Sequence, residues 1–197
     1  MSDTLIYRIG GAVYINLTNK CTNNCTFCLR ETHDGVDGYH LRLKKDPEAA
    51  EVIAALEQES DVSESVFCGL GEPTMRLETL LDVAKYLKSR SSHVRLNTNG
   101  QGSAYAGHDI APELKGIIDI VSISLNASDA AEYDAICKSI YGEEGFDHML
   151  EFAGSCIREG IETVLSVVDV IGQEEIERCQ KIADDLGARL RVRHYIE

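Results

Sequence analysis

The chain has 197 residues, which is enough for one sizeable hydrophobic core. Its 33 acidic and 19 basic residues give a net charge of −14, which argues against broad contact with nucleic-acid phosphates or anionic membranes. No stretch approaches the roughly 18 unbroken apolar residues of a membrane span, and the first residues lack the pattern of a signal peptide. We therefore expect a cytoplasmic protein with neither a membrane nor a nucleic acid as its partner.

Short β-rich runs alternate along the chain with longer helical patterns. The predicted strands are Ala12–Leu17, Ser65–Cys68, His93–Asn97, Ile120–Leu125, Glu162–Asp169 and Arg189–His194. The predicted helices are Asp46–Gln58, Leu77–Ser89, Asp129–Cys137, Phe146–Glu159 and Glu174–Leu186. This alternation predicts parallel strands with helices packed on them. Because a full eight-fold barrel needs about 250 residues, we expect an α/β fold of the partial (β/α)6-barrel type, with residues 1–197 as a single domain.

Polar and apolar residues alternate along several of these strands. In the fourth predicted strand Val121 and Ile123 share one face, and Ser122 and Ser124 share the other. The corresponding polar positions on the other strands are Tyr14, Asn16, Arg95, Asn97, Arg191 and Arg193. Buried parallel strands normally read as continuous apolar runs, so a polar face indicates a ligand-binding lumen. The alternative is a one-sided sheet with this face in solvent. By the same alternation His194 is expected in the core.

Three of the seven cysteines, Cys21, Cys25 and Cys28, directly follow the first predicted strand. Ligands bind at the carboxyl ends of strands in α/β folds, and thiolates at this density select zinc, copper(I) or an iron–sulfur cluster. With His33 as a fourth ligand the trio would form a non-catalytic Cys3His zinc module. Without it, the trio would hold three irons of a cubane cluster and leave one iron open. The odd number of cysteines and the expected cytosolic setting disfavour a disulfide framework.

The cysteine loop and several later motifs resemble the radical SAM superfamily. The spacing Cys21-xxx-Cys25-xx-Cys28, with Phe27 before the last cysteine, is similar to the signature of that family. The further motifs that resemble it, in the order of the family, are Gly69-Leu-Gly-Glu-Pro73, Asn97-Thr-Asn-Gly100, Ser122-Ile-Ser-Leu-Asn126 and, more loosely, Val168–Glu175. Together these matches span almost the whole chain, and their conjunction is far more specific than any single motif.

The resemblance implies two cofactors and a set of site residues. A [4Fe–4S] cluster would be held by Cys21, Cys25 and Cys28, and S-adenosylmethionine would bind its open iron and be cleaved reductively to a 5′-deoxyadenosyl radical. The residues implied to bind S-adenosylmethionine are Phe27, Gly69, Gly71, Glu72, Asn97, Asn99, Ser124, Asn126, Val168 and Arg193. Glycines allow close approach of the backbone, a carboxylate suits the ammonium group, and amides and hydroxyls suit the ribose. An electron donor such as flavodoxin or ferredoxin is implied as a partner.

The whole-chain pattern is most similar to the TatD-associated radical SAM proteins. This similarity includes Tyr14-Ile-Asn-Leu-Thr-Asn19 and Arg191-Val-Arg-His-Tyr195. Larger family members carry C-terminal cysteine clusters that this sequence lacks, so we expect no auxiliary-cluster domain. Arginines on the polar face need anionic partners, because an unpaired buried charge is costly, and we therefore expect a small anionic substrate. The alternatives are an activating enzyme that installs a glycyl radical on a partner protein and a rearranging enzyme of the deazapurine-synthase type.

Overall fold

The fold is taken from a computed structural model that describes residues 3–32 and 35–194. His33 and Tyr195, which were singled out from the sequence, lie outside the described residues. The chain divides into two compact units. The first unit comprises Met1–Cys21, Cys28–Asn97 and Gly116–Asp119, and the second comprises Thr22–Phe27, Thr98–Lys115 and Ile120–Glu197.

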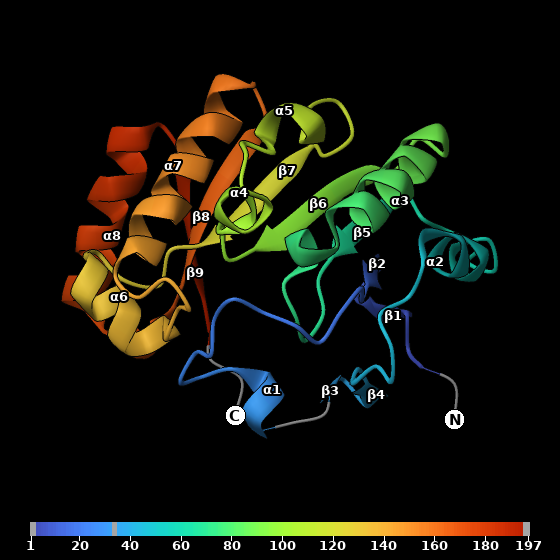
Figure 1. The fold of residues 1–197 in the computed structure, drawn as a ribbon, viewed down its shortest axis with the longest axis horizontal. Helices are drawn as coiled ribbons and strands as arrows, with labels where there is room; N and C mark the ends of the chain where they lie inside the picture. The colour runs from blue at the N-terminus through green and yellow to red at the C-terminus, as the bar shows by residue number, and fades with distance from the viewer. Residues whose placement is uncertain (1–2, 33–34, 195–197) are drawn as a thin grey trace. The chain divides into compact units, whose positions relative to one another are not determined.

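The first unit contains a sheet with the strand order β1-β2-β5-β6 (Figure 1). Its elements are β1 (Ile6–Ile9), β2 (Ala12–Ile15), α1 (Leu29–Thr32), β3 (Gly35–Val36), β4 (Tyr39–His40), α2 (Ala49–Leu56), β5 (Glu64–Phe67), the 3-10 helix η1 (Pro73–Arg76), α3 (Leu77–Ser89) and β6 (His93–Thr98). Strands β2, β5 and β6 run parallel, whereas β1 pairs antiparallel with β2. Helices α2 and α3 pack against each other.

The register of β2, β5 and β6 separates an apolar face from a polar one. Ile15, Phe67 and Leu96 stand side by side across the three strands and are fully buried. The neighbouring row contains Tyr14 and Arg95 and must point to the opposite face, because successive side chains alternate along a strand. The alternation predicted from the sequence is therefore confirmed in this unit.

The second unit contains the parallel strands β7 (Ile120–Ser124), β8 (Glu162–Val168) and β9 (Arg189–Arg193), in that order. Its helices are α4 (Gly102–Ala106), α5 (Ala111–Leu114), α6 (Ala130–Cys137), α7 (Glu144–Arg158), the 3-10 helix η2 (Asp169–Ile171) and α8 (Gln173–Leu186). Figure 1 shows α7 and α8 beside the strands that they connect. Ile123 and Leu165 pair on the fully buried face, and Ser124, Ser166 and Arg191 form the adjacent row on the other face.

Local capping explains where the longer helices begin and end. The predicted helix Leu77–Ser89 is confirmed as α3 at both ends. Helix α2 begins later than the predicted Asp46, because Glu48 precedes its first turn and the Glu48 N–H donates to the Glu51 carboxylate at 2.9 Å. Helix α8 ends at Leu186, and the next residue, Gly187, has a φ of +75°, the left-handed conformation that glycine adopts without strain.

Several elements were not predicted from the sequence. Strand β1 is joined to β2 through Gly10 and Gly11, and Gly10 has a φ of +59°. A glycine pair between two apolar runs is a hairpin signal, but the first run was not recognised as a strand. The two-residue strands β3 and β4 and the short helices α1, α4 and α5 are too brief to show a hydrophobic period.

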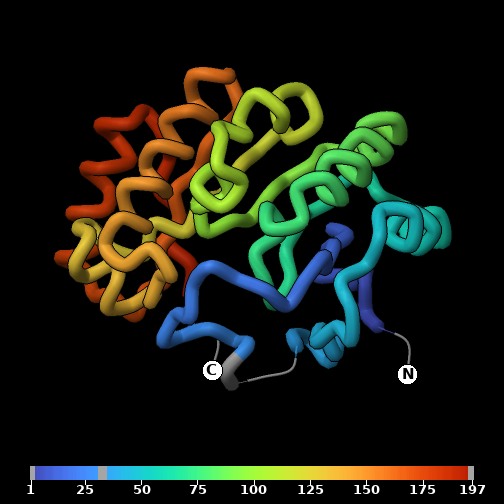
Figure 2. The backbone as a smooth tube through the Cα atoms, in the orientation of Figure 1, coloured from blue at the N-terminus to red at the C-terminus, as the bar shows by residue number. Residues whose placement is uncertain are grey.

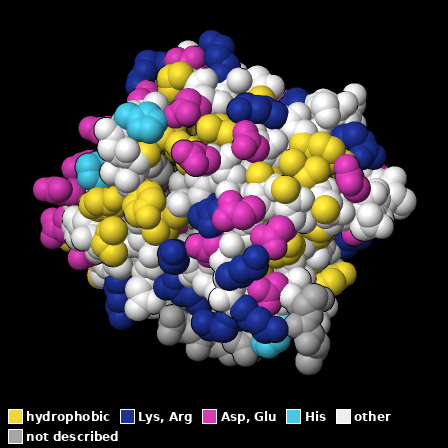
Figure 3. All heavy atoms as spheres, turned by 45° about the vertical axis from the view of Figure 1, so that its right-hand side comes forward, with side chains coloured by type: hydrophobic (Ala, Val, Ile, Leu, Met, Phe, Trp, Pro, Cys, Tyr) yellow, Lys and Arg dark blue, Asp and Glu magenta, His cyan; other side chains and the backbone are white. Residues whose placement is uncertain are grey.

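Two further features are the apolar length of the helices and the charge on one face of the molecule. No helix within residues 3–32 or 35–194 is both long and apolar enough to cross a membrane. On the face drawn in Figure 3, acidic and basic side chains are interspersed. Exposed pairs such as Lys45 with Glu51, 2.9 Å apart, show this mixing at the level of individual residues.

The fold class follows from the strands and helices of each unit. Both units combine parallel strands with helices that connect them. The α/β class with a mostly parallel sheet is thus confirmed.

Candidate functional site

The glycine motif after β5 packs its backbone against the residues that precede Cys21. A Cβ atom on Gly71 would lie 2.4 Å from the carbonyl oxygen of Thr18 and 2.5 Å from that of Lys20. The Glu72 N–H donates to the same Lys20 carbonyl at 2.7 Å. Only glycine permits this approach, and the approach fixes the motif beside the segment that leads into the cysteine loop.

Glu72 is held in one orientation at the end of this motif. Its side chain is buried, and Oε1 accepts from the Thr74 N–H at 3.0 Å and from the Thr74 hydroxyl at 2.7 Å. These bonds cap η1 and fix the carboxylate before any ligand arrives. A buried carboxylate oriented in this way suits a cationic ammonium group.

The residues between β2 and Cys21 are also tied to the segment that follows the β3–β4 hairpin. Asn16 Nδ2 donates to the Leu41 carbonyl at 2.7 Å, and Asn19 Nδ2 donates to the Leu43 carbonyl at 2.7 Å. The Leu43 N–H returns a bond to Asn19 Oδ1 at 3.0 Å. This reciprocal pairing fixes the backbone just before the first cysteine.

Asp46 also binds the residues between β2 and Cys21. It accepts a hydrogen bond from the Thr18 hydroxyl at 2.8 Å and lies 3.3 Å from Lys20 and 3.6 Å from Arg76. Burial alone would raise the pKa of Asp46, but the hydrogen bonds and the two cations outweigh it and hold that pKa below its usual value. The carboxylate is thus a charged anchor for the strand end.

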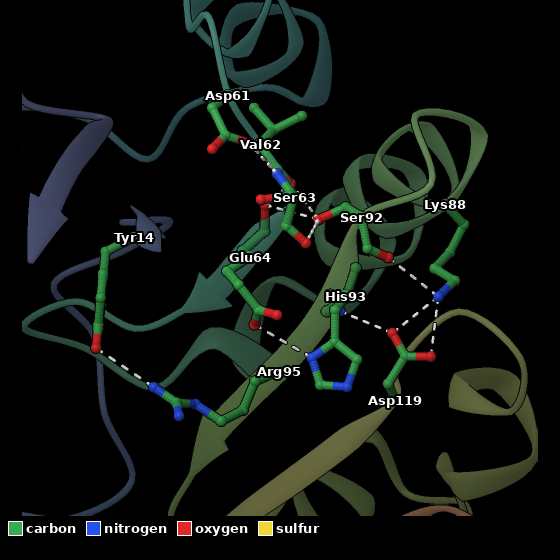
Figure 4. Close-up of polar contacts among 12 residues, drawn as sticks. Tyr14, Asp61, Val62, Ser63, Glu64, Lys88, Ser92, His93, Arg95 and Asp119 are labelled. Atoms are coloured by element: carbon green, nitrogen blue, oxygen red, sulfur yellow. Dashed lines mark hydrogen bonds and ion pairs between the residues drawn. The ribbon is translucent and has the colours of Figure 1, made fainter. Parts of the chain in front are cut away.

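The polar face of the first unit presents two successive rows of side chains. Tyr14 and Arg95 belong to one row, and the Arg95 Nη2 donates to the Tyr14 hydroxyl at 3.3 Å (Figure 4). Asn97 is two residues further along β6, nearer its carboxyl end. The Oδ1 atom of Asn97 is buried and has no hydrogen-bond donor among the described residues. An acceptor in this state fits a ligand that brings N–H or O–H groups.

Gly69 allows one more close approach on this face. A Cβ atom there would lie 2.1 Å from Asn16 Oδ1, which is a buried acceptor without a donor in the described part of the chain. Both glycines predicted to bind the cofactor are therefore needed for packing within the first unit.

In the second unit the segment around Cys25 runs along the C-terminal end of α6 (Figure 2). The Asn24 N–H donates to the Cys137 carbonyl at 2.9 Å, and the Thr26 N–H donates to the Ile136 carbonyl at 2.9 Å. These main-chain bonds flank Cys25 on both sides. The position of the second cysteine is therefore set by the end of a helix more than a hundred residues away in the sequence.

A buried polar network supports the same segment. The Tyr133 hydroxyl accepts from Asn23 Nδ2 at 3.2 Å and from Gln101 Nε2 at 3.0 Å. Burial, and next the neighbouring Cys137, raise the pKa of Tyr133 above its usual value, so its hydroxyl stays neutral. The sequence reading missed Tyr133 and Gln101. A tyrosine in a helix and a glutamine after a turn carry no signal that they meet.

Asn99 and Asn126 have different roles in the second unit. Asn99 Nδ2 donates to the Thr22 hydroxyl at 2.7 Å, and its Oδ1 accepts from the Gln101 N–H at 2.9 Å, so its amide holds the cysteine segment. Asn126 has a φ of +58°, is buried, and its Oδ1 has no donor among the residues that the structure describes. The Oδ1 atom of Asn126 is therefore a buried acceptor that no described residue uses.

The other predicted site residues of this unit are placed by strand register. Val168 stands beside Arg193 across β8 and β9. Ser124 pairs with Ser166, which is two residues before Val168 on β8 and therefore on the same face. Phe27, Ser124 and Arg193 are half-buried, and Val168 is buried.

His194 was expected in the core, but this prediction is wrong. Its side chain is 93% exposed and pairs with Asp169 at 2.7 Å, because β9 ends the strand order of the unit.

The donor set is compatible with a metal cluster. All seven cysteines are described, and none forms a disulfide. Cys21, Cys25 and Cys28 are half-buried, so their thiols are reachable, whereas Cys156 and Cys179 are buried and burial raises the pKa of each to about 12. Among the described residues no three His, Cys, Asp or Glu side chains converge on a single ion. The zinc alternative depended on His33, which lies outside the described residues.

These features fit the two cofactors that the motifs imply. Accessible thiols in one short loop provide soft ligands for iron. In the first unit, the fixed carboxylate of Glu72 suits an ammonium group and the donor-free acceptor of Asn97 suits a hydroxyl or N–H group, and S-adenosylmethionine carries both kinds. In the second unit, the donor-free acceptor of Asn126 suits a hydroxyl group.

Comparison with known proteins connects these features to a family. The model of the radical SAM superfamily matches residues 15–186. A probable GTP 3′,8-cyclase of Methanocaldococcus jannaschii is 25% identical over 189 residues, which cover 92% of this chain and 58% of that protein. The chain thus spans less than two thirds of this curated relative.

Solved structures show a similar fold. SuiB of Streptococcus suis bound to the precursor peptide SuiA has a TM-score of 0.71 at 18% identity, over 93% of this chain and 39% of that one. Native anSMEcpe with bound AdoMet has a TM-score of 0.66 at 16% identity, over 93% of this chain and 51% of that one.

Proposed function

Because this chain belongs to the radical SAM superfamily, whose enzymes use a [4Fe–4S] cluster and S-adenosylmethionine, we propose that it cleaves S-adenosylmethionine reductively and uses the product radical to abstract hydrogen from a small anionic substrate. The cluster supplies the electron, and the protein binds, orients and shields the reactants. Cys21, Cys25 and Cys28 would hold the cluster.

The packing of the glycine motif against the strand end before Cys21 is the observation that carries this proposal. The Glu72 N–H and the backbone of Gly71 both lie against the Lys20 carbonyl, so the residue that bears the fixed carboxylate is tied to the segment that leads to Cys21. Glu72 would accept from the ammonium of S-adenosylmethionine, and Asn97 would accept from another of its donors. Phe27 and Val168 would offer apolar surface to the adenine, and Gly69 and Gly71 would line the approach.

The second unit, considered by itself, also has polar positions to which we assign contacts with the cofactor. Asn126 would accept from a ribose hydroxyl through its donor-free Oδ1. Ser124 and Arg193 would bind polar groups from their rows on β7 and β9, and Asn99 would act by holding the cysteine segment.

The substrate class rests on charge and on a relative. The M. jannaschii relative is named for a reaction of GTP, which is a small anionic molecule. In this chain the half-buried Arg95 has no carboxylate partner among the described residues. We propose further that residues 1–197 act as one radical SAM core in the cytoplasm. Flavodoxin or ferredoxin would supply the electron, and the chain would group with the TatD-associated radical SAM proteins. No described feature favours a protein substrate over a small molecule.

The test is anaerobic reconstitution followed by incubation with S-adenosylmethionine and dithionite. We expect about four irons per chain and release of 5′-deoxyadenosine that depends on the reductant. Deuterated candidate substrates should transfer label to that product. Colourless protein that keeps one tightly bound zinc and forms no 5′-deoxyadenosine would exclude the proposal in favour of the zinc module.

A further inference from the structure

Arg95 is a half-buried cation that the protein leaves without a counterion. Its Nη2 donates to the Tyr14 hydroxyl at 3.3 Å, which is a long bond to a neutral group. Its Nε is buried and has no acceptor, and no carboxylate pairs with the guanidinium anywhere in residues 3–32 or 35–194. A guanidinium carries five N–H donors, so most of its hydrogen-bonding capacity is unused by the described residues.

Three other half-buried cations of the first unit each lie beside a carboxylate. Arg8 lies 2.8 Å from Glu59, Arg76 lies 3.6 Å from Asp46, and Lys88 lies 2.8 Å from Asp119. Figure 4 shows the contrast directly. Lys88 and Asp119 point toward each other, whereas Arg95 extends toward Tyr14 and away from the Asp119 carboxylate. Because an unpaired charge out of water is costly, this exception needs a ligand or a function.

The position of Arg95 relates it to the proposed cofactor site. Arg95 and Asn97 share one face of β6, and two residues of a strand span about 6.6 Å. Tyr14 lies in the same row as Arg95, across β5. Arg95 therefore lies on the same face as Asn97, the residue that we assign to S-adenosylmethionine, but two residues closer to the amino end of β6.

The surroundings of Tyr14 are aromatic and apolar. Its ring is 5.2 Å from the ring of Tyr7, which is 3% exposed and packs with Leu41 and Leu70. The Tyr7 hydroxyl donates to the Cys68 carbonyl at 3.1 Å and is therefore already engaged. A ligand at Arg95 would thus meet a cation and one tyrosine hydroxyl beside an apolar wall.

We propose that Arg95 and Tyr14 bind the carboxylate or phosphate group of the substrate, an assignment that rests on the proposed function only in calling the ligand a substrate. Arginine matches both groups through paired N–H donors, and the tyrosine hydroxyl adds a donor at its edge. The bound molecule would carry this anionic group one row below the cofactor and place its reacting carbon toward the cysteine end of the strands.

The experiment titrates sodium phosphate and sodium acetate, at constant ionic strength, into the reconstituted full chain with S-adenosylmethionine bound. The arginine Nε–H resonances of nitrogen-15-labelled protein report binding, and their loss in Arg95→Gln assigns Arg95. We expect a saturable shift at Arg95 with at least one anion, about tenfold weaker binding or more in Arg95→Gln, and partial retention in Arg95→Lys. Saturation by phosphate alone indicates a phosphorylated substrate, and saturation by acetate alone indicates a carboxylic acid.

Arg90→Gln is the matched control. Arg90 is exposed and also bonds a tyrosine hydroxyl, that of Tyr86 at 2.7 Å, so its loss should leave anion binding unchanged. No saturable shift at Arg95 with either anion would overturn the proposal. So would a tenfold loss of affinity for S-adenosylmethionine in Arg95→Gln, since Arg95 would then serve the cofactor carboxylate. Absence of 5′-deoxyadenosine together with a saturable shift would reject the proposed function and leave the anion site standing.

Discussion

The two ends of the strands in the first unit satisfy their polar groups in opposite ways. Near the amino ends, Asp119 accepts from the Val94 N–H at 2.7 Å and from Lys88 at 2.8 Å, and Ser92 donates to the Ser65 hydroxyl at 3.0 Å (Figure 4). Toward the carboxyl ends, buried atoms of Arg95 and Asn97 have no partner within the described residues.

This difference separates stability from binding. Polar groups that the protein satisfies itself stabilise the fold, and removing one partner leaves the other buried and unpaired. Groups left unsatisfied cost stability and persist where a ligand completes them. The carboxyl end is also the end that continues into Cys21 and the glycine motif, so binding and fold stability are expected to respond to different substitutions.

The largest effect is expected at the cysteine loop. Cys21→Ala should reduce 5′-deoxyadenosine formation to the background level, because two thiolates cannot hold the cluster. The metal-free variant should unfold within a few degrees of the wild type, since the Cys21 side chain is only half-buried. Iron analysis and a thermal scan under anaerobic conditions measure both quantities. Retained iron and activity would show that Cys21 is not a ligand.

Gly71→Ala should affect both binding and stability, because Gly71 packs against the backbone before Cys21 and directly precedes Glu72. The added methyl group would contact the Thr18 and Lys20 carbonyls at 2.4 and 2.5 Å, so the backbone must shift. We expect a loss of about 1–3 kcal/mol in unfolding free energy, measured by urea denaturation, and weaker binding of S-adenosylmethionine. Gly11→Ala is the control, since nothing lies within 4 Å of its Cβ position. Equal stability of the two variants would refute the packing role.

Asp119→Asn tests the amino end alone. We expect a loss of about 2 kcal/mol in unfolding free energy, because Lys88 and the Val94 N–H lose a charged acceptor, with unchanged affinity for S-adenosylmethionine. Asp82→Asn, which removes an exposed pair with Lys85 at 3.4 Å, should change stability by less than about 0.5 kcal/mol. A drop in cofactor affinity with Asp119→Asn would contradict the separation of the two ends.

The same carboxylate makes stability depend on pH. Burial alone would raise the pKa of Asp119, but hydrogen bonds from Lys88 and Val94 outweigh it and lower that pKa. Its contribution is therefore present above the unfolded-state pKa of about 3.9 and is lost as the pH falls through the lower folded value. Wild-type stability should fall more steeply than that of Asp119→Asn below about pH 4. Parallel acid limbs in urea denaturation would argue against this assignment.

The smallest effect is expected at Asn97. Asn97→Ala removes an acceptor that has no donor in the described residues, so stability should change little. Affinity for S-adenosylmethionine should fall roughly fivefold to tenfold, as expected for one hydrogen bond. Calorimetric titration with the reconstituted protein measures it. A variant that binds normally but unfolds more readily would place Asn97 with the stabilising groups instead.

The sequence was informative wherever a period or a motif carried the signal. Helix Leu77–Ser89 and the inward rows of β6 and β7 follow from apolar periodicity. The contacts that orient the site do not, because they join distant segments. Examples are the bonds from Asn24 and Thr26 to the end of α6.

Exposure at a sheet edge was equally hidden in the sequence. His194 directly follows β9 and was placed by extending the alternation of that strand, yet it is exposed, since alternation does not tell which strand is outermost. Strand β1 was missed although Gly10 and Gly11 mark its hairpin, because four residues give too short a pattern.

The most direct test of the open-iron site is the electron paramagnetic resonance spectrum of the reduced, reconstituted protein before and after addition of S-adenosylmethionine. A cluster held by Cys21, Cys25 and Cys28 alone has one iron that the cofactor can bind, so the account predicts that the signal shifts when S-adenosylmethionine is added and shifts less in Glu72→Gln. A cluster signal that S-adenosylmethionine leaves unchanged, or a protein that takes up no iron, would contradict it.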